Sequence, residues 1–237
     1  AGVPAEIRYD EYASIGALVE ACTKKFADRE AYHCMGRDIT FGELDALTRR
    51  FGAWLLAKGL TKGDRVALMM PNVLQYPVAL FGTLRAGLTV VNVNPLYTPR
   101  ELEHQLKDSG AETIVILENF ATTLQQVIDK TPVKNVVVAS MGDLLGFKGV
   151  IVNFVVRHVK KMVPAFDLPG AIRFNEALEQ GARASFTPFP TTLEDVAFLQ
   201  YTGGTTGVSK GAVLLHRNIL ANIAQASTWL LSGLKDV

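Results

Sequence analysis

The chain has 237 residues and a formal net charge of +1, and it is 49% hydrophobic and 20% charged. These values are typical of a globular protein and exclude a disordered chain. A net charge near zero gives no overall positive electrostatic potential that would attract nucleic acid. The sequence has no apolar run long enough to span a membrane, no signal peptide and only two cysteines, so it predicts a cytoplasmic protein.

The first 59 residues predict a short hairpin followed by a helix. The dipeptide Gly36-Arg37 separates the runs AYHCM and DIT, which is typical of two paired strands. Thr40 and Glu43 have the spacing of a capping box at the start of a helix. Gly59 stands where the C-cap of that helix is expected.

From residue 60 the chain alternates between strands and helices. Capping signals at Asn72 and at Thr98, which is followed by Pro99 and Glu101, predict helices that end near Gly87 and Gly110. A third helix is expected over 120–130. The short apolar runs that predict strands are 65–70, 89–94, 113–117, 135–140 and 196–202. This alternation predicts an α/β fold with a parallel sheet covered on both faces, and such sheets bind ligands beyond the carboxyl ends of their strands.

Residues 141–195 lose the alternation and predict an insertion or a connection between layers. Within them, the stretch 150–166 combines one apolar helical face with a basic end. The face consists of Ile151, Phe154, Val155, Val159 and Met162, and the basic residues are Arg157, His158, Lys160 and Lys161. This pattern suits a helix at the surface of an anionic membrane, but a helix packed on the sheet or a subunit contact explains it as well.

The segment YTGGTTGVSKG, residues 201–211, holds four glycines, four serine or threonine residues and one lysine. Glycines let successive N–H groups point into one concavity, hydroxyls donate to phosphate oxygens, and a lysine supplies a mobile positive charge. The segment therefore predicts either a phosphate-binding loop or a mobile hairpin turn without a ligand.

Neither of the two common phosphate-binding spacings fits this segment. A Walker loop needs a hydroxyl residue after its lysine, and Gly211 follows Lys210 instead. A dinucleotide fingerprint needs glycine at position 202, where threonine stands. Both of those loops lead from a strand into a helix, whereas the apolar run 212–215 predicts that this loop joins two strands. A helix is expected after it, from Arg217 to about Leu231.

Residues 201–211 resemble the phosphate-loop signature of the adenylate-forming superfamily, which includes the acyl-CoA synthetases. The stretches 71–87, 90–111, 152–166 and 198–222 resemble bacterial long-chain fatty acid–CoA ligases more specifically. The resemblance covers nearly the whole chain from about residue 10. It implies that this chain is the N-terminal part of such an enzyme.

The resemblance implies a two-step reaction, in which a fatty acid and ATP form acyl-AMP and coenzyme A then displaces AMP, with Mg²⁺ as the metal. Ser209 stands where members of the superfamily vary. No catalytic residue is expected within this chain, because the later motifs of the family, including its metal-binding pair and catalytic lysine, are absent from it. The residues expected to bind the phosphates of ATP are Thr202, Gly203, Gly204, Thr205, Thr206, Gly207, Ser209 and Lys210.

The resemblance also implies a domain division. Residues 1–59 would belong to a second sheet layer, 60–215 would form the α/β subdomain that ends in the loop, and 216–237 would start a truncated next subdomain. The expected partners are fatty acid, ATP and coenzyme A, without nucleic acid. Peripheral contact with the inner face of the cell membrane through 150–166, and a homodimer, are additional expectations. We expect the isolated chain to be inactive.

Two other functions are compatible with the same residues. One is adenylation of an aryl or amino acid, since the acid pocket would lie beyond Val237. The other is a non-catalytic module that binds a nucleotide or a partner protein. The acyl chain length cannot be read from this sequence.

The histidines and the side chains near the second strand have simpler explanations than catalysis. The four histidines are too far apart in sequence to predict a zinc site. His216 is expected at the start of a helix and His104 on the surface of one. Asn94 and Tyr97 follow a strand end, where a site edge and a turn are equally compatible with them.

Overall fold

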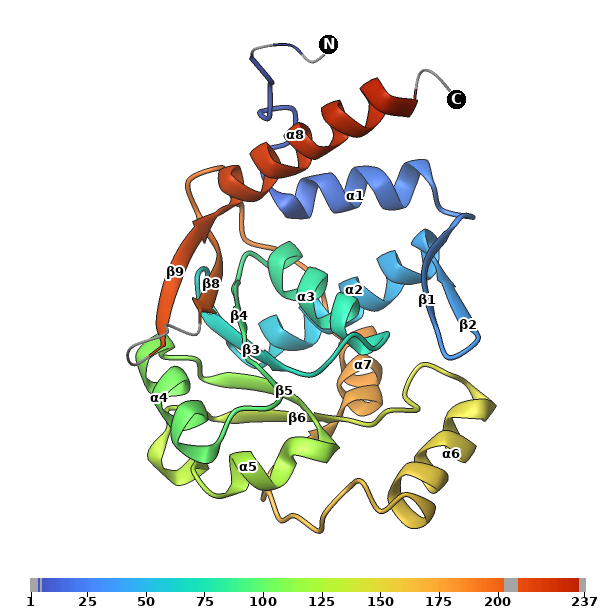
Figure 1. Ribbon diagram of the computed structural model, residues 1–237, viewed down its shortest axis with the longest axis vertical. Helices are drawn as coiled ribbons and strands as arrows, with labels where there is room; N and C mark the ends of the chain where they lie inside the picture. The colour runs from blue at the N-terminus through green and yellow to red at the C-terminus, as the bar shows by residue number, and fades with distance from the viewer. Residues whose placement is uncertain (1–3, 5, 203–208, 235–237) are drawn as a thin grey trace.

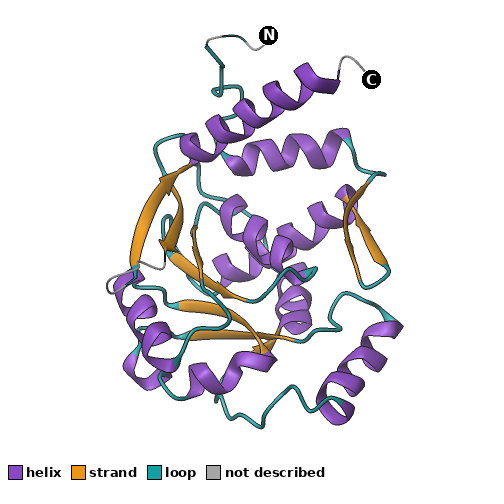
Figure 2. Cartoon of the chain, viewed as in Figure 1, coloured by secondary structure: helices purple, strands orange, loops and turns teal. Residues whose placement is uncertain are grey.

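The computed structural model describes residues 4, 6–202 and 209–234. In this part of the chain, the main sheet has seven strands in the order β7-β6-β5-β3-β4-β8-β9. Every neighbouring pair is parallel except β8 and β9, which are antiparallel. The sheet crosses the molecule with helices on both sides (Figure 1, Figure 2), so the predicted α/β fold with a mainly parallel sheet is confirmed.

The strands of the sheet lie close to the apolar runs that predicted them. They are β3 (Arg65–Met69), β4 (Thr89–Asn92), β5 (Thr113–Leu117), β6 (Asn135–Ala139), β7 (Ile172–Arg173), β8 (Val196–Thr202) and β9 (Lys210–Leu215). A separate hairpin of β1 (Glu30–Cys34) and β2 (Arg37–Thr40) precedes them. Its turn residues Met35 and Gly36 both have positive φ, as a tight two-residue hairpin turn requires.

The helix boundaries show how far local sequence signals, such as capping boxes, determine where a helix begins. They are α1 (Ile15–Lys25), α2 (Phe41–Ala57), α3 (Gln75–Arg85), α4 (Pro99–Ser109), α5 (Ala121–Gln125), α6 (Phe147–Phe154), α7 (Phe174–Ala182) and α8 (His216–Leu234). Both predicted capping boxes are present, at Thr40 and at Thr98. Each satisfies backbone N–H groups that a helix start would otherwise leave unpaired.

Three helix predictions need correction. Asn72 caps no helix, because the backbone turns first, with the Val73 N–H donating to the Pro71 carbonyl, and α3 then begins at Gln75 without a side-chain cap. The helix expected over 120–130 is three short pieces, since Val127 leaves the helical region at φ −131°. The segment near 150–166 is helical only as α6 and a following π turn at Val155–Val159, so Met162 lies beyond it.

Each face of the sheet packs against its own set of helices. Val66 and Leu68 of β3 belong to the core that contains residues of α1, α2, α3 and α7. Ala67 and Met69, the alternate residues of the same strand, belong to the core that contains residues of α4 and α5. Because both faces are covered, the strands read as continuous apolar runs. Figure 1 shows α4 and α5 on one side of the sheet and α2, α3 and α7 on the other.

The helices of the first 59 residues pack on this sheet through α3 and α7. Helix α2 contacts both of them, and its Phe51 and Leu55 share one hydrophobic core with β3 and β4. The close approach of α2 to α3 depends on glycine, because a Cβ on Gly82 would lie 2.9 Å from the Thr48 carbonyl oxygen. The expected domain boundaries at 59 and 215 stay predictions.

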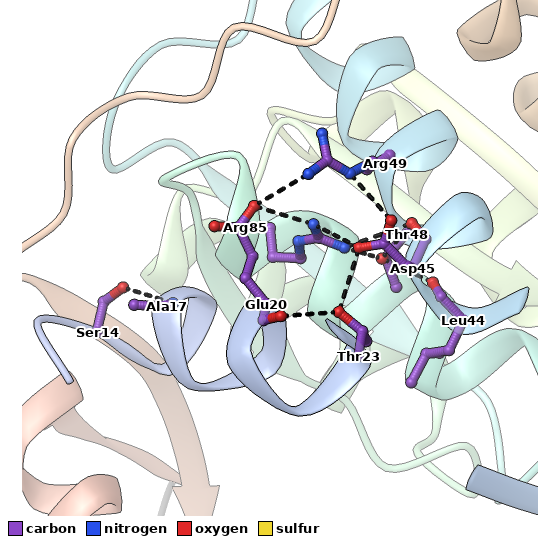
Figure 3. Close-up of polar contacts among 9 residues, drawn as sticks. All are labelled: Ser14, Ala17, Glu20, Thr23, Leu44, Asp45, Thr48, Arg49 and Arg85. Atoms are coloured by element: carbon purple, nitrogen blue, oxygen red, sulfur yellow. Dashed lines mark hydrogen bonds and ion pairs between the residues drawn. The ribbon is translucent and has the colours of Figure 1, made fainter. Parts of the chain in front are cut away.

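Arg85 joins three helices at a single buried point (Figure 3). Its Nη2 lies 3.0 Å from Glu20 of α1 and 2.9 Å from Asp45 of α2, and its Nη1 donates to the Thr48 hydroxyl at 2.6 Å. The Arg85 side chain is 1% exposed. Its carboxylate partners are less buried, since the Glu20 side chain is 41% exposed and that of Asp45 is 32% exposed, so water screens part of each attraction.

We predict that Arg85→Met lowers the free energy of unfolding by about 2 kcal/mol, because the buried Thr48 hydroxyl and two partly exposed carboxylates lose a charged hydrogen-bond donor. The matched control is Arg49→Met. Arg49 contacts the same two carboxylates but is 45% exposed, so its loss should cost less than about 1 kcal/mol. Urea denaturation followed by circular dichroism measures both values. Equal losses in the two variants would contradict the prediction.

Candidate phosphate-binding hairpin

The candidate site is the connection between β8 and β9 at the carboxyl end of β8. These strands pair antiparallel, with Tyr201 opposite Gly211 and Thr202 opposite Lys210. The predicted strand-to-strand connection is therefore confirmed. Five of the expected phosphate residues lie outside the described residues, namely Gly203, Gly204, Thr205, Thr206 and Gly207. The structure describes the three others, at the two ends of the connection.

The three described candidate phosphate-binding residues differ in whether their side chains are already bonded within the protein. The Ser209 hydroxyl donates to the Thr202 carbonyl at 3.1 Å, which ties the two ends of the connection together. Thr202 and Lys210 are exposed. Lys210 makes no ion pair with any residue that the structure describes, so its charge is available to an anion. Ser209 thus closes the hairpin, whereas the role of Lys210 in binding phosphate stays a prediction.

Helix α4 holds both ends of this connection. The Nε2–H of His104 donates to the Ser209 carbonyl at 3.1 Å, and the Tyr201 hydroxyl donates to Asp108 at 2.6 Å. Burial, followed by that bond to a carboxylate, raises the pKa of Tyr201 far above its usual value. His104 is half-buried against the site instead of lying free on a helix surface. No local pattern predicts these pairs, because their members are about a hundred residues apart in the chain.

A line of polar side chains crosses from α3 to β8 beside the site. The Tyr76 hydroxyl donates to the Asn92 side-chain oxygen at 2.9 Å, and the Asn92 amide donates to Gln200 at 2.9 Å. Gln105 of α4 donates to the Asn92 backbone carbonyl at 2.8 Å. These bonds fix the last residue of β4 and the strand that leads into the connection.

Asn94 and Tyr97, for which the sequence allowed either the edge of a site or a turn, have structural roles. The Asn94 side chain accepts from the Leu96 N–H, as in a turn, and Tyr97 packs against the core beneath α4. His216 begins α8, as predicted, and is buried. Its Nδ1 accepts from the Ile15 N–H at 3.1 Å, which joins α8 to the start of α1. Burial lowers the pKa of His216.

A second polar centre, which the sequence did not predict, lies beyond β5 and β6. Glu118 follows β5 and is 1% exposed. Arg157 contacts both of its carboxylate oxygens, at 3.0 and 2.8 Å, and Arg173 contacts it at 3.0 Å. Near it, burial raises the pKa of Asp143 to about 6. In the described part of the chain, no group of three or more His, Cys, Asp or Glu residues is arranged to hold a metal ion.

The model of the AMP-binding enzyme family matches residues 19–237, which is most of the chain, so this protein belongs to the AMP-binding enzymes. Together with the hairpin at the carboxyl end of β8, this match confirms the family resemblance noted in the sequence.

The relatives with high sequence identity to this chain include long-chain-fatty-acid–CoA ligases of bacteria. The long-chain-fatty-acid–CoA ligase of Salmonella typhimurium is 57% identical over 227 residues, which are 95% of this chain and 40% of that protein. The corresponding ligase of Haemophilus influenzae is 54% identical over 93% of this chain and 39% of that protein. The chain therefore spans about 40% of the length of these relatives.

Solved structures of CoA ligases have a similar fold over most of this chain. A long-chain-fatty-acid-CoA ligase from Archaeoglobus fulgidus has a TM-score of 0.72 and 26% identity, over 96% of this chain and 41% of that chain. The anthranilate CoA ligase AuaEII has a TM-score of 0.71 at 20% identity, over 87% of this chain and 35% of that chain. At that identity, the second likeness shows the fold alone.

We predict that His216 makes folding stability fall at acid pH. Its pKa is lowered in the folded protein, so stability should decrease as the pH drops below the unfolded value of about 6.5, where the unfolded chain takes up the proton more readily. In His216→Asn the amide oxygen can still accept from Ile15 but does not titrate.

The measurement is the urea midpoint at pH 7.5 and at pH 5.5. The difference between the two midpoints should be smaller in His216→Asn than in the wild type. His158→Asn, at an exposed position on a different element, is the control and should keep the wild-type difference. An unchanged pH dependence in His216→Asn would contradict the prediction.

Proposed function

We propose that this chain is the N-terminal, ATP-binding part of a long-chain fatty acid–CoA ligase. The observation that carries the proposal is the 57% identity to such a ligase over 95% of the chain. In the proposed reaction the fatty acid carboxylate attacks the α-phosphate of ATP and releases pyrophosphate. The thiol of coenzyme A then attacks the acyl carbonyl and releases AMP.

The β8–β9 hairpin is the part of this chain to which we assign the triphosphate. Phosphoryl and nucleotidyl transfers depend mainly on positioning and charge stabilisation. Lys210 is exposed and without a counter-ion among the described residues, so it can contact the β- and γ-phosphates. Thr202 lies opposite it in the hairpin register. With the outer phosphates held there, the α-phosphate is left accessible to the carboxylate.

Magnesium and coenzyme A belong to the proposal as ligands of the whole enzyme. Mg²⁺ would neutralise charge on the triphosphate. The described carboxylates gather into no metal site, so we assign no metal ligand to this chain. We propose that the residues that contact the thiol and the acyl carbonyl come from the part of the relatives that this chain does not match.

The preference for a long-chain acid rests on the names of the relatives. The same fold occurs in a ligase of anthranilate, so the fold does not discriminate between acids. A panel of long-chain, medium-chain, aryl and amino acids, tested with the longer protein that contains this chain, distinguishes the proposal from its alternative. The highest kcat/KM for an aryl or amino acid would overturn the assignment.

We propose a cytoplasmic location with peripheral contact on the inner face of the cell membrane, where free fatty acids partition. Among the residues that the structure describes, none of the helices combines the length and the hydrophobicity that a transmembrane span needs. The expected homodimer stays a prediction that sedimentation velocity tests.

In the longer protein, Lys210→Ala should lower the rate of palmitate-dependent ATP–pyrophosphate exchange by about 10- to 100-fold, because a charge that stabilises the triphosphate is lost. The matched control is Lys24→Ala, an exposed lysine at the end of α1, which should keep the wild-type rate. If Lys210→Ala retains the wild-type rate and ATP affinity, the assignment of the hairpin to the triphosphate fails.

The 237-residue chain by itself should not catalyse exchange. The same assay, run on the purified chain with palmitate and Mg-ATP, should give no signal above a blank without protein. Exchange at a rate comparable to that of the longer protein would show that the catalytic groups lie within this chain.

A further inference from the structure

The segment 147–162 exposes more large apolar side chains than any other stretch of similar length in the described chain. Their exposed fractions run from 54% for Met162 to 84% for Phe147. We call this set the docking face, and its residues are Phe147, Val150, Ile151, Phe154, Val159 and Met162. Contiguous apolar surface of this kind marks a site of interaction.

The docking face continues from α6 into the π turn that follows it. Phe147, Val150, Ile151 and Phe154 share one side of α6 because they are spaced three and four residues apart. The His158 ring packs against Phe154, with ring centroids 5.1 Å apart, so His158 borders the face. Val159 follows it at the end of the π turn over Val155–Val159 and is 62% exposed. The face thus differs from the one expected from sequence, since Val155 is only partly exposed.

The opposite side of the segment is fixed to the body of the protein. The Asn153 side chain accepts from the Gly142 N–H at 2.7 Å, and Arg157 pairs with the buried Glu118. Asn119 donates to the Met162 carbonyl at 3.0 Å. A Cβ on Gly149 would overlap the carbonyl oxygen of Gly142, so the helix lies directly on this backbone. The docking face is therefore held outward by specific bonds.

The charge around the docking face has one sign. From residue 144 to residue 166 the sequence contains no acidic residue but has five basic ones, namely Lys148, Arg157, His158, Lys160 and Lys161. All of them except Arg157, which is bound to Glu118, are exposed. Helix α8 offers a contrast, since it exposes Ile223, Trp229 and Leu230 but has no charged residue from 218 to 234.

This contrast decides which partner fits each surface. An apolar face without charges suits another protein surface, whereas apolar side chains next to lysines suit the boundary between anionic headgroups and acyl chains. The docking face also lies at the other end of the long axis from α8 (Figure 1). Building on the membrane contact in the proposed function, we propose that the docking face inserts into the surface of an anionic lipid bilayer, with Lys160 and Lys161 at headgroup level. Lys148 lies beside the face but donates to the Met35 carbonyl at 3.0 Å.

Flotation with lipid vesicles tests this proposal on the chain as it stands. The vesicles are phosphatidylcholine alone, or phosphatidylcholine with about 30% phosphatidylglycerol, and the chain should float only with the anionic ones. Ile151→Ser/Phe154→Ser should lower the bound-to-free ratio by more than about tenfold through lost apolar insertion. Lys160→Glu/Lys161→Glu should lower it by about tenfold or more through lost attraction.

Matched controls separate the docking face from general surface effects. Leu96→Ser removes an apolar side chain that is 82% exposed elsewhere, and Lys24→Glu/Lys25→Glu reverses two exposed charges on α1. Both controls should bind anionic vesicles like the wild type. Lys210→Ala should also bind like the wild type, which separates this proposal from the assignment of the hairpin. Circular dichroism verifies that each variant is folded.

Three results would overturn the proposal. The first is the absence of wild-type flotation with anionic vesicles. The second is flotation that the docking-face variants leave unchanged. The third is a lipid-free dimer, seen by sedimentation velocity, that Ile151→Ser/Phe154→Ser converts to monomer. That result would assign the face to a second copy of the chain.

Discussion

A parallel sheet that is buried on both faces has only its edges and strand ends left for chemistry, and this constraint governs the molecule. The helices cover both faces of the sheet at β3, since successive residues of this strand pack into two different cores, so neither face can receive a ligand there. The polar groups that the fold must satisfy therefore collect where the strands end. The β8–β9 connection and the Glu118 centre both lie at the carboxyl ends of strands, as is general for such sheets.

These two places use polar side chains in different ways. At the hairpin, α4 supplies bonds to Ser209 and Tyr201 while Lys210 stays without a counter-ion in the described structure. At Glu118, two arginines neutralise a carboxylate that is nearly inaccessible to water. The first arrangement leaves a charge for a ligand. The second uses its charges internally, to fix the segment 147–162 on the sheet.

Sequence reasoning succeeded where a feature depends on neighbours in the chain. The capping boxes at Thr40 and Thr98, and the turn at Gly36, need only residues within one helical turn or hairpin, so their patterns could be read directly. The parallel sheet followed from short apolar runs between helices. The Walker and dinucleotide spacings were excluded by single residues, and the observed β8–β9 pairing agrees with that exclusion.

What the sequence did not show depends on residues that are far apart. The His104–Ser209 bond joins residues 105 positions apart, and the Arg157–Glu118 pair joins residues 39 apart. The π turn after α6 has no composition that predicts it. Helix α7 lies within residues 141–195, where the alternation of helices and strands could not be read from the sequence. Asn72 had the residue type of a cap, but the turn after Pro71 placed it outside the helix.

Strand β9 has one further consequence, which concerns association. It is the last strand of the order, paired only with β8 in the described structure, and it exposes Val213 to 57%. An edge strand presents a row of backbone donors and acceptors that a second extended chain can pair with. A lysine on such an edge opposes that pairing through its charge and hydration. Lys210 begins this strand, so the side chain that we assign to the phosphates also puts a positive charge on this edge of the described sheet.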